Sequence, residues 1–394
     1  MALSHSPRVV TNGLVLYFDA ANASKNATGS LASNLIVNGN FANGQGSPQE
    51  VGSNPTNTIV ALANPGDTGW VLQQTGNYAE YQLNISSGMS ASTTYVMSGW
   101  YAKSANYVGA DVMFHSRAYA AGGSHVATGF GIGSLIYSTV VNGITWEFRY
   151  QAFTTPSDFT GYFEWYVGYG TNNTGGVRYY TNLRLEKGTY PSIRDLSGNG
   201  NTGEFVNGTT FSSANAGSLS FDGTNDYLTI PHNASLNFGT GDFTVLVGMN
   251  GVSAYPGGSK TVIRKGSRFD GNIAGWGIMW AGSPEDLYFI ISSSSARLEG
   301  RTVPSFGLNG WTGFKQLGMR RSSGTWSQIN NTTLTTLGTF TGDVSGTEPL
   351  TIAYNSYYGS YMSFGLCYCM VYNRALSSAE LSQNFNAVRS RYGV

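Results

Sequence analysis

The sequence Met370–Leu381, MVYNRALSSAEL, decides the fold of this chain, because it joins a buried strand to the start of a helix. Ser377 is the expected N-cap of that helix, and Glu380, three residues later, completes a capping box. Leu376 and Leu381, on either side of the cap, predict a hydrophobic staple. The apolar residues of the helix recur at helical spacing until Gly393 ends it; they are Leu381, Phe385, Val388 and Tyr392.

The rest of the chain has the composition of an all-β protein. Its 53 glycines and many Ser, Thr and Asn residues predict frequent turns. Leu14–Ala20, Tyr81–Ile85 and Tyr162–Tyr169 predict strands, the last two by their alternation, and Thr94–Lys103 predicts a half-buried strand. A length of 394 residues is too great for one typical domain and suits two β-sandwiches.

Charge and cysteine content exclude several classes of protein. The formal net charge is zero and only 11% of residues are charged, which argues against a nucleic-acid partner. We expect no membrane insertion, because no apolar run reaches about 18 residues, and no signal segment at Met1–Arg8. Cys367 and Cys369, at positions i and i+2 of a strand, are expected to share one face as buried, reduced thiols, which suits a reducing cytosol.

Several motifs in order carry a resemblance to a known fold. Leu14–Ala20, the turn Asp195–Asn201, the segment Gly217–Leu228 and the closing strand and helix resemble the concanavalin A-like lectin/glucanase fold in its laminin-G-like branch. The variants with a basic-aromatic-Gly tail look most like those in structural proteins of tailed bacteriophages. In this chain the second motif follows the first only after about 175 residues, which a typical loop does not explain.

The delay predicts an inserted domain at residues 34–186. Its segments Asn34–Phe41, Thr94–Lys103 and Arg178–Gly188 resemble family-4/9-type carbohydrate-binding modules. The expected architecture is therefore all-β, with two nested antiparallel sandwiches: residues 1–33 and 187–394 form a concanavalin A-like jelly roll, and 34–186 form an inserted jelly roll. A single enlarged sandwich is the alternative.

The resemblance implies a non-enzymatic virion structural protein, a surface-exposed decoration or appendage subunit whose lectin-like domains adhere to polysaccharide. Its expected partners are other virion proteins of the capsid or tail and copies of itself, and its expected place is the virion surface after assembly in the host cytoplasm. The first alternative is a host-recognition tail fibre or receptor-binding adhesin with a specific glycan site. A glycoside hydrolase ranks behind both, because Glu147 and Glu164 are isolated and the paired-carboxylate pattern of the glucanases is missing.

Aromatic residues supply the candidates for sugar stacking and for an interface. Trp100, Trp146 and Trp276 alternate with small or polar residues, which predicts core positions. The carbohydrate-binding candidates in the insert are Trp70, Tyr78, Trp165, Tyr166 and Tyr169. A tyrosine-rich loop near the end of the chain suits a subunit interface better than a sugar platform; its residues are Tyr354, Tyr357, Tyr358 and Tyr361.

No cofactor is required by this interpretation, and a structural calcium ion is the one metal that the sequence suggests. Oxygen ligands cluster in two turns, at Asp195 and Asn199 and at Asp222 and Asp226. Laminin-G-like domains often bind calcium, as the resemblance implies. Asx-Gly turns use the same residues for backbone hydrogen bonds, and this interpretation is favoured over calcium. Asp19 is open to both roles.

Overall fold

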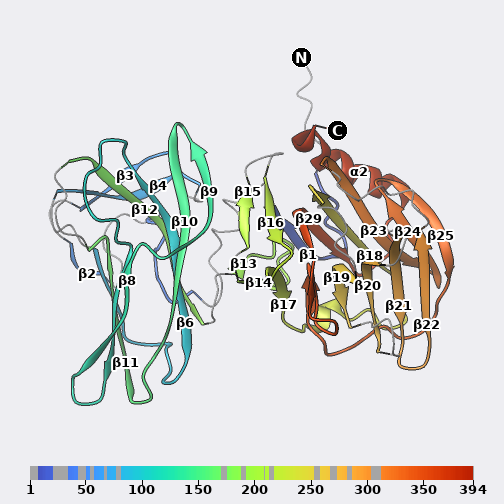
Figure 1. Ribbon diagram of the computed structural model, residues 1–394, viewed down its shortest axis with the longest axis horizontal. Helices are drawn as coiled ribbons and strands as arrows, with labels where there is room; N and C mark the ends of the chain where they lie inside the picture. The colour runs from blue at the N-terminus through green and yellow to red at the C-terminus, as the bar shows by residue number, and fades with distance from the viewer. Residues whose placement is uncertain are drawn as a thin grey trace. The chain divides into compact units, whose positions relative to one another are not determined.

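The computed structural model describes residues 8–20, 34–42, 50–53, 57–65, 69–76, 81–169, 175–187, 192–207, 209–212, 217–252, 258–266, 273–281, 286–302 and 312–393. The chain divides into two compact units. One comprises residues 27–192 and is called the inner unit; the other comprises residues 1–26 and 193–394 and is called the outer unit, after their order in the sequence. Both are built from antiparallel strands (Figure 1).

Two sheets make up the inner unit. The strands of the first hydrogen-bond in the order β9-β10-β6-β12-β4-β3. These are β9 (Ser134–Val141), β10 (Ile144–Thr154), β6 (Thr94–Lys103), β12 (Val177–Lys187), β4 (Trp70–Thr75) and β3 (Asn57–Ala61). The second sheet has the order β2-β5-β11-β7-β8. These are β2 (Glu50–Ser53), β5 (Tyr81–Ile85), β11 (Phe159–Val167), β7 (Phe114–Ala120) and β8 (His125–Gly131).

A core of apolar side chains from both sheets makes the inner unit a sandwich. Leu83, Phe163 and Trp165 contribute from the five-stranded sheet, and Met97 and Phe153 from the six-stranded sheet. The rings of Phe153 and Phe163 stack across the core with centroids 4.8 Å apart. The alternation expected for Tyr81–Ile85 is confirmed, because Tyr81, Leu83 and Ile85 are buried and the residues between them are half-buried.

The expectation that Thr94–Lys103 forms a half-buried strand is wrong. Strand β6 is buried on both faces, not on one, since every residue from Tyr95 to Ala102 is buried. Tyr95, Met97 and Tyr101 enter the core between the sheets. On its second face, Trp100 meets Phe148 of neighbouring β10 edge-to-face, with ring centroids 5.4 Å apart, and both side chains are buried.

The outer unit also contains two large sheets. The strands of one follow the order β25-β24-β23-β18-β29-β16-β15, with β1 paired to β29. These are β25 (Thr333–Thr339), β24 (Thr325–Asn330), β23 (Phe314–Ser322), β18 (Phe243–Asn250), β29 (Ser363–Tyr372), β16 (Ser218–Asp222), β15 (Thr210–Ser212) and β1 (Leu14–Asp19). The other has the order β13-β14-β17-β26-β19-β20-β21-β22. These are β13 (Ser192–Ile193), β14 (Gly203–Val206), β17 (Tyr227–Ile230), β26 (Leu350–Ile352), β19 (Lys260–Lys265), β20 (Gly275–Ala281), β21 (Asp286–Ser292) and β22 (Arg297–Thr302).

The capped helix expected from the sequence is confirmed. Helix α2 (Ser378–Arg389) has Ser377 as its N-cap, and both hydrogen bonds of the capping box with Glu380 are present. Arg374 donates to both carboxylate oxygens of Glu380, at 3.0 and 2.6 Å. The short 3-10 turn η4 (Ser390–Tyr392) follows, and Gly393 ends it in the left-handed region, with φ of 70°.

The helix packs against one face of the sheet that contains β18 and β29. Leu381, Val388 and Tyr392 join a buried cluster with Leu246 of β18 and Met370 of β29. The opposite face of the sheet packs toward the second sheet, where the ring of Phe243 lies 6.0 Å from that of Trp276 in β20. Trp276 is fully buried, as are Trp100 and Trp146, so the core positions expected for these three tryptophans are confirmed.

The two cysteines are free and buried, as expected, but they do not share a face. A β-bulge opposite Gly248 and Met249 leaves Cys367 as the extra residue of β29. Cys367 therefore enters the helix-facing cluster together with Tyr368 and Met370, while Cys369 lies outside that cluster. Burial raises the pKa of both thiols well above the usual range.

Candidate functional site

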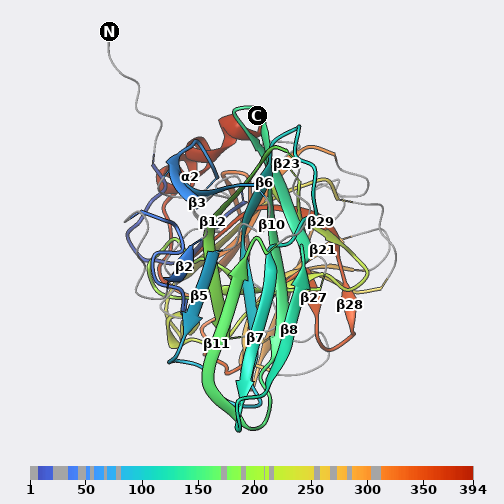
Figure 2. The ribbon, with the colours of Figure 1, turned by 90° about the vertical axis from the view of Figure 1, so that its left-hand side faces the viewer.

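The outward face of the five-stranded sheet in the inner unit carries a continuous set of aromatic and polar side chains. The pairing register of the strands brings these side chains together, because Glu164 of β11 lies opposite Asn84 of β5 and Arg117 of β7. Figure 2 views this sheet from the side on which β5, β11, β7 and β8 run next to one another. We call the following set the aromatic sheet face: Gln82, Asn84, His115, Arg117, Tyr119, Tyr162, Glu164, Tyr166 and Tyr169.

Glu164 is the centre of this face and is almost completely buried by its neighbours. One carboxylate oxygen accepts hydrogen bonds from the hydroxyls of Tyr119 and Tyr166, at 2.8 and 2.7 Å. The other accepts from the Tyr162 hydroxyl at 3.3 Å and from the Gln82 amide at 3.5 Å. The carboxylate is thus held in one orientation by donors from three strands.

A second group of rings surrounds His115, opposite Tyr166 in the pairing of β7 with β11. The His115 ring lies 4.3 Å from Tyr169, 5.1 Å from Tyr166 and 5.6 Å from Phe130, measured between centroids. The Phe130 side chain is 68% exposed, so the group opens to solvent. Gly168 permits this arrangement because it adopts a φ of 76° between β11 and Tyr169.

The surroundings of the face shift the pKa values of its tyrosines and its histidine, and so fix which groups carry a proton. Burial, together with the hydrogen bond to Glu164, raises the pKa of the Tyr166 hydroxyl, so this hydroxyl stays protonated and donates. The same causes raise the pKa of Tyr119. Burial and the nearby charge of Arg117 lower the pKa of His115, which keeps its ring neutral at pH 7.

Flat rings next to fixed hydroxyl, amide and guanidinium groups are suited to a polyhydroxylated ligand. The apolar C–H faces of a sugar ring pack on aromatic rings through dispersion and loss of water. Its hydroxyls both donate and accept, and so match the amide and guanidinium groups and the phenolic hydroxyls of the face.

Two of the sugar-stacking candidates, Tyr166 and Tyr169, lie together on this face, with ring centroids 6.5 Å apart. Trp165 does not join them, and its selection as a sugar-stacking residue is wrong. Its side chain has no exposed surface and its indole N–H donates to the Met113 carbonyl at 3.0 Å. Side chains alternate along a strand, so the neighbour of an outward Tyr166 must point into the core, where Trp165 stacks on Phe114.

The remaining two sugar-stacking candidates are elsewhere. Trp70 begins β4 in the six-stranded sheet and is 40% exposed, so the structure does not bring it onto the aromatic sheet face. Tyr78 lies outside the described residues.

The four interface candidates of the outer unit gather in one hairpin, formed by β27 (Tyr354–Asn355) and β28 (Ser360–Tyr361). The rings of Tyr354 and Tyr361 stack with centroids 4.9 Å apart, and Tyr227 stacks on Tyr354 at 4.4 Å. At the turn, Tyr357 and Tyr358 are each 44% exposed. The hairpin thus presents two tyrosines on a stacked aromatic base.

The turns considered for calcium form the hydrogen bonds expected of Asx turns. The Asp195 carboxylate accepts from the backbone N–H groups of Tyr17, Ser197 and Asn201, at 2.9, 2.9 and 3.0 Å. Asp222 accepts from the Thr224 N–H at 2.7 Å.

The other members of the two turns also form hydrogen bonds with backbone groups. Asn199 donates to the Leu14 carbonyl at 3.0 Å, and Asp226 accepts from the Asp222 N–H at 3.3 Å. Across the described residues, no group of three or more His, Cys, Asp or Glu side chains is arranged to hold a metal ion. Calcium binding stays a prediction. Asp19 binds Arg391 and the Tyr17 hydroxyl, at 2.9 Å each.

Sequence reasoning did not propose six of the nine residues of the face as site residues, and it treated Glu164 only as an isolated acid. The six are Gln82, Asn84, His115, Arg117, Tyr119 and Tyr162. A signal was present in β7, where His115, Arg117 and Tyr119 alternate with small residues. Such a period-two pattern places three polar and aromatic side chains on one side of a strand.

The comparisons with known proteins are distant. No family model and no curated protein sequence matches this chain. Among solved structures, the binding domain of Paraclostridial Mosquitocidal Protein 1 is 16% identical over 50% of this chain and 49% of that chain, with a TM-score of 0.40.

Two further structures match at a similar level. The binding domain of botulinum neurotoxin DC in complex with SialylT is 13% identical over 50% of this chain and 48% of that chain, with a TM-score of 0.40. The Trypanosoma rangeli sialidase in complex with the inhibitor DANA is 13% identical over 50% of this chain and 31% of that chain, with a TM-score of 0.37. This chain thus matches half or less of the length of each, and a similarity this distant does not extend to function.

In the part of the chain that the structure describes, no helix has the length and apolar character to cross a membrane.

Proposed function

We propose that this protein is a non-enzymatic glycan-binding protein that holds polysaccharide along the aromatic sheet face of its inner unit. The observation that carries the proposal is the cluster of Tyr166, Tyr169 and His115 next to the hydrogen-bonded Glu164. The half-buried rings of Tyr169 and His115 supply stacking surface and the network supplies oriented hydrogen-bonding groups. Because the sheet already holds both, the cost of ordering them on binding is lowered.

The arrangement of carboxylates supports binding rather than hydrolysis. Most glycoside hydrolases need two carboxyl groups on either side of the scissile bond. Glu164 lies in the five-stranded sheet and is occupied by tyrosine hydroxyls, whereas Glu147 lies in the six-stranded sheet and pairs with Arg149 at 2.8 Å. The raised pKa of Tyr166 also makes its hydroxyl a poor nucleophile.

The biological setting follows from the resemblance to laminin-G-like proteins of tailed bacteriophages. In this proposal the chain is a decoration or appendage subunit of a virion. The outer unit is a concanavalin A-like sandwich and the inner unit is a carbohydrate-binding-module-like sandwich. The tyrosine hairpin contacts a virion protein or another copy of the chain. Many copies on one particle raise avidity even when each site is weak. Mass spectrometry of purified particles tests this setting, and absence of the chain from them contradicts it.

Glycan binding is tested by retention of the full chain on polysaccharide columns, followed by isothermal titration. Tyr169→Ala removes a ring that contacts His115 and leaves β11 intact, so we expect retention to be lost. Trp70→Ala is the matched control, because Trp70 is an exposed aromatic residue of the other sheet. Loss of retention in Trp70→Ala with normal retention in Tyr169→Ala contradicts the proposed site.

A further inference from the structure

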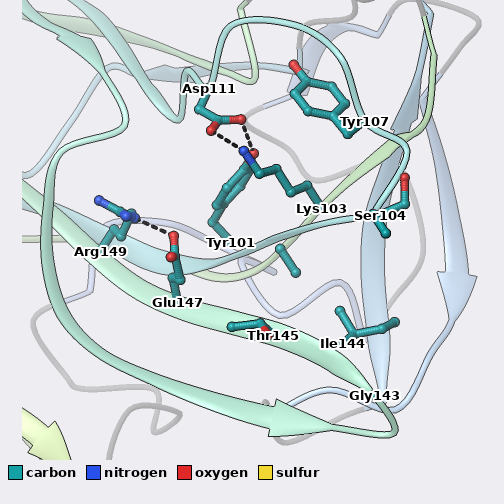
Figure 3. Close-up of a pocket in the computed structure, with 12 residues that line it drawn as sticks. Tyr101, Lys103, Ser104, Tyr107, Asp111, Gly143, Ile144, Thr145, Glu147 and Arg149 are labelled. Carbon is teal, nitrogen blue, oxygen red and sulfur yellow. Dashed lines mark hydrogen bonds and ion pairs between the residues drawn. The ribbon is translucent and has the colours of Figure 1, made fainter.

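The inner unit contains a second feature, a pocket of about 430 Å³ away from the aromatic sheet face. It is lined by the end of β6, the loop after it, and β10, all outside the five-stranded sheet. Its volume lies within the range of sites that bind small molecules. Figure 3 shows its lining, which includes charged, aromatic and hydroxyl side chains.

The charges of the pocket are paired in advance. The Lys103 amine lies 2.6 Å from an oxygen of Asp111, and the Arg149 guanidinium lies 2.8 Å from Glu147. Tyr101 donates its hydroxyl to the second oxygen of Asp111 at 2.5 Å. Two positive and two negative side chains give the lining a net charge of zero.

Paired groups still have capacity for further hydrogen bonds. An ionised carboxylate has about four acceptor positions and a lysine ammonium has three donors. Asp111 uses two acceptor positions for Tyr101 and Lys103, and its side chain keeps 30% of its surface exposed. Glu147 is 29% exposed. The pocket therefore offers acceptors and donors side by side to a ligand that enters it.

An aromatic wall completes the pocket. The Tyr107 hydroxyl donates to the Ala110 carbonyl at 2.8 Å, and the Tyr107 N–H donates to the Ser104 carbonyl at 3.0 Å. Ser104 in turn accepts from the Val177 N–H at 2.9 Å, which ties the loop to β12. The ring is thus fixed before any ligand arrives, which lowers the entropy cost of binding.

The opposite wall comes from the β9–β10 hairpin. Asn142 and Gly143 both have positive φ, at 48° and 79°, the pattern of a type I′ turn. This turn places Ile144 and Thr145 at the rim of the pocket (Figure 3). Thr145 is exposed, so a larger side chain at this position would fill the opening without removing a buried contact.

We propose that this pocket binds a single neutral sugar residue, such as the terminal hexose of a glycan, through the carboxylates of Asp111 and Glu147 and the ring of Tyr107. Sugar hydroxyls can donate to the carboxylates and accept from Lys103 without breaking either ion pair. A ligand with a net charge gains less here, because each charge of the pocket already has a partner of opposite sign. The pocket is a site separate from the aromatic sheet face and does not depend on it.

Saturation-transfer NMR on the full chain with the methyl glycosides of glucose, galactose and mannose tests this site, with glucuronic acid and glycine as charged probes. We expect transfer to a neutral glycoside, and affinity lowered about tenfold or more in Asp111→Asn. Thr145→Trp, which fills the opening and breaks no ion pair, is expected to remove the transfer. Ser157→Trp adds the same ring at an exposed turn outside the pocket and controls for nonspecific effects.

Three results overturn the proposal: no transfer to any neutral glycoside, equal transfer in Thr145→Trp and Ser157→Trp, or stronger binding of glucuronic acid or glycine. If Asp111→Asn unfolds, Thr145→Trp alone decides. The two proposals fail separately, because methyl glycosides in the Thr145→Trp variant test the pocket, whereas polysaccharide retention in Tyr169→Ala tests the sheet face.

Discussion

Two residues of the β11 region on opposite sides of one sheet allow a sharp test of which side binds. Trp165 points into the core and Tyr169 belongs to the outward face. Replacing each in turn by alanine should therefore separate stability from binding. Both are aromatic and four positions apart, so the pair controls for the general loss of an aromatic ring.

For Trp165→Ala we expect a loss of about 4 kcal/mol in the free energy of unfolding, the middle of the range for a fully buried tryptophan. Two lost contacts account for this expected loss of stability. The stack on Phe114 is lost, with centroids 5.7 Å apart, and the Met113 carbonyl loses its indole donor. A domain has about 5–15 kcal/mol of stability, so this variant should be marginal.

For Tyr169→Ala we expect a loss of about 1 kcal/mol or less, because the side chain is half-buried and its contacts are ring contacts at the surface. Urea unfolding monitored by tryptophan fluorescence measures both values, with hydrogen exchange in β7 and β11 to assign the transition to the inner unit. Polysaccharide retention is measured on the same samples.

The reasoning is refuted if Trp165→Ala keeps wild-type stability and loses binding while Tyr169→Ala binds normally. That result would place the binding side chains on the opposite side of β11. A large destabilisation in Tyr169→Ala would show that this ring belongs to the core and that its effect on retention is indirect.

Three further predictions concern other parts of the chain. Glu164→Gln weakens retention and lowers the free energy of unfolding by about 2 kcal/mol, because three tyrosine hydroxyls lose a charged acceptor; unchanged retention and stability contradict it. Hydrogen bonds from Arg374 lower the pKa of Glu380 to about 2 from an ordinary 4.5. The cap therefore stabilises the fold fully above pH 4.5, and this stabilisation is lost as the pH falls toward 2. Because the Glu380 side chain is partly exposed, we expect the free energy of unfolding to lose about 1 kcal/mol between pH 7 and pH 2, a loss that is absent in Glu380→Gln. Identical pH profiles in urea unfolding would disprove this. Cys367 and Cys369 should react with a thiol reagent only in the unfolded protein, and fast reaction in the folded state contradicts their burial.

The capped helix could be predicted in detail because its signals are local. Ser377 and Glu380 are three residues apart, and Gly393 needs no partner to adopt positive φ. The positions of β1, β5, β6 and β29 were also readable, since apolar runs and alternation lie within one strand. Whether β6 had one buried face or two was not readable, because that depends on the rings of β10, about 50 residues away.

The candidate site depends on pairing that the sequence does not encode locally. Glu164 meets Arg117 and Asn84 only after β11 has paired with β7 and β5 in the correct register. One strand alone left the direction of its side chains open: Trp165 and Tyr166 are both aromatic, and nothing within the strand says which one faces the core. The bulge at Cys367 is another case, since one extra residue changes the face of a side chain.

The central claim is that the aromatic sheet face binds glycan, and its most direct test is titration of a retained polysaccharide into a triple variant. In this variant His115, Tyr166 and Tyr169 are replaced by alanine, and its fold is verified by circular dichroism. The account predicts that binding measured by calorimetry disappears, while the Trp70→Ala variant binds as the wild-type protein does. A folded triple variant that binds with wild-type affinity would contradict the account.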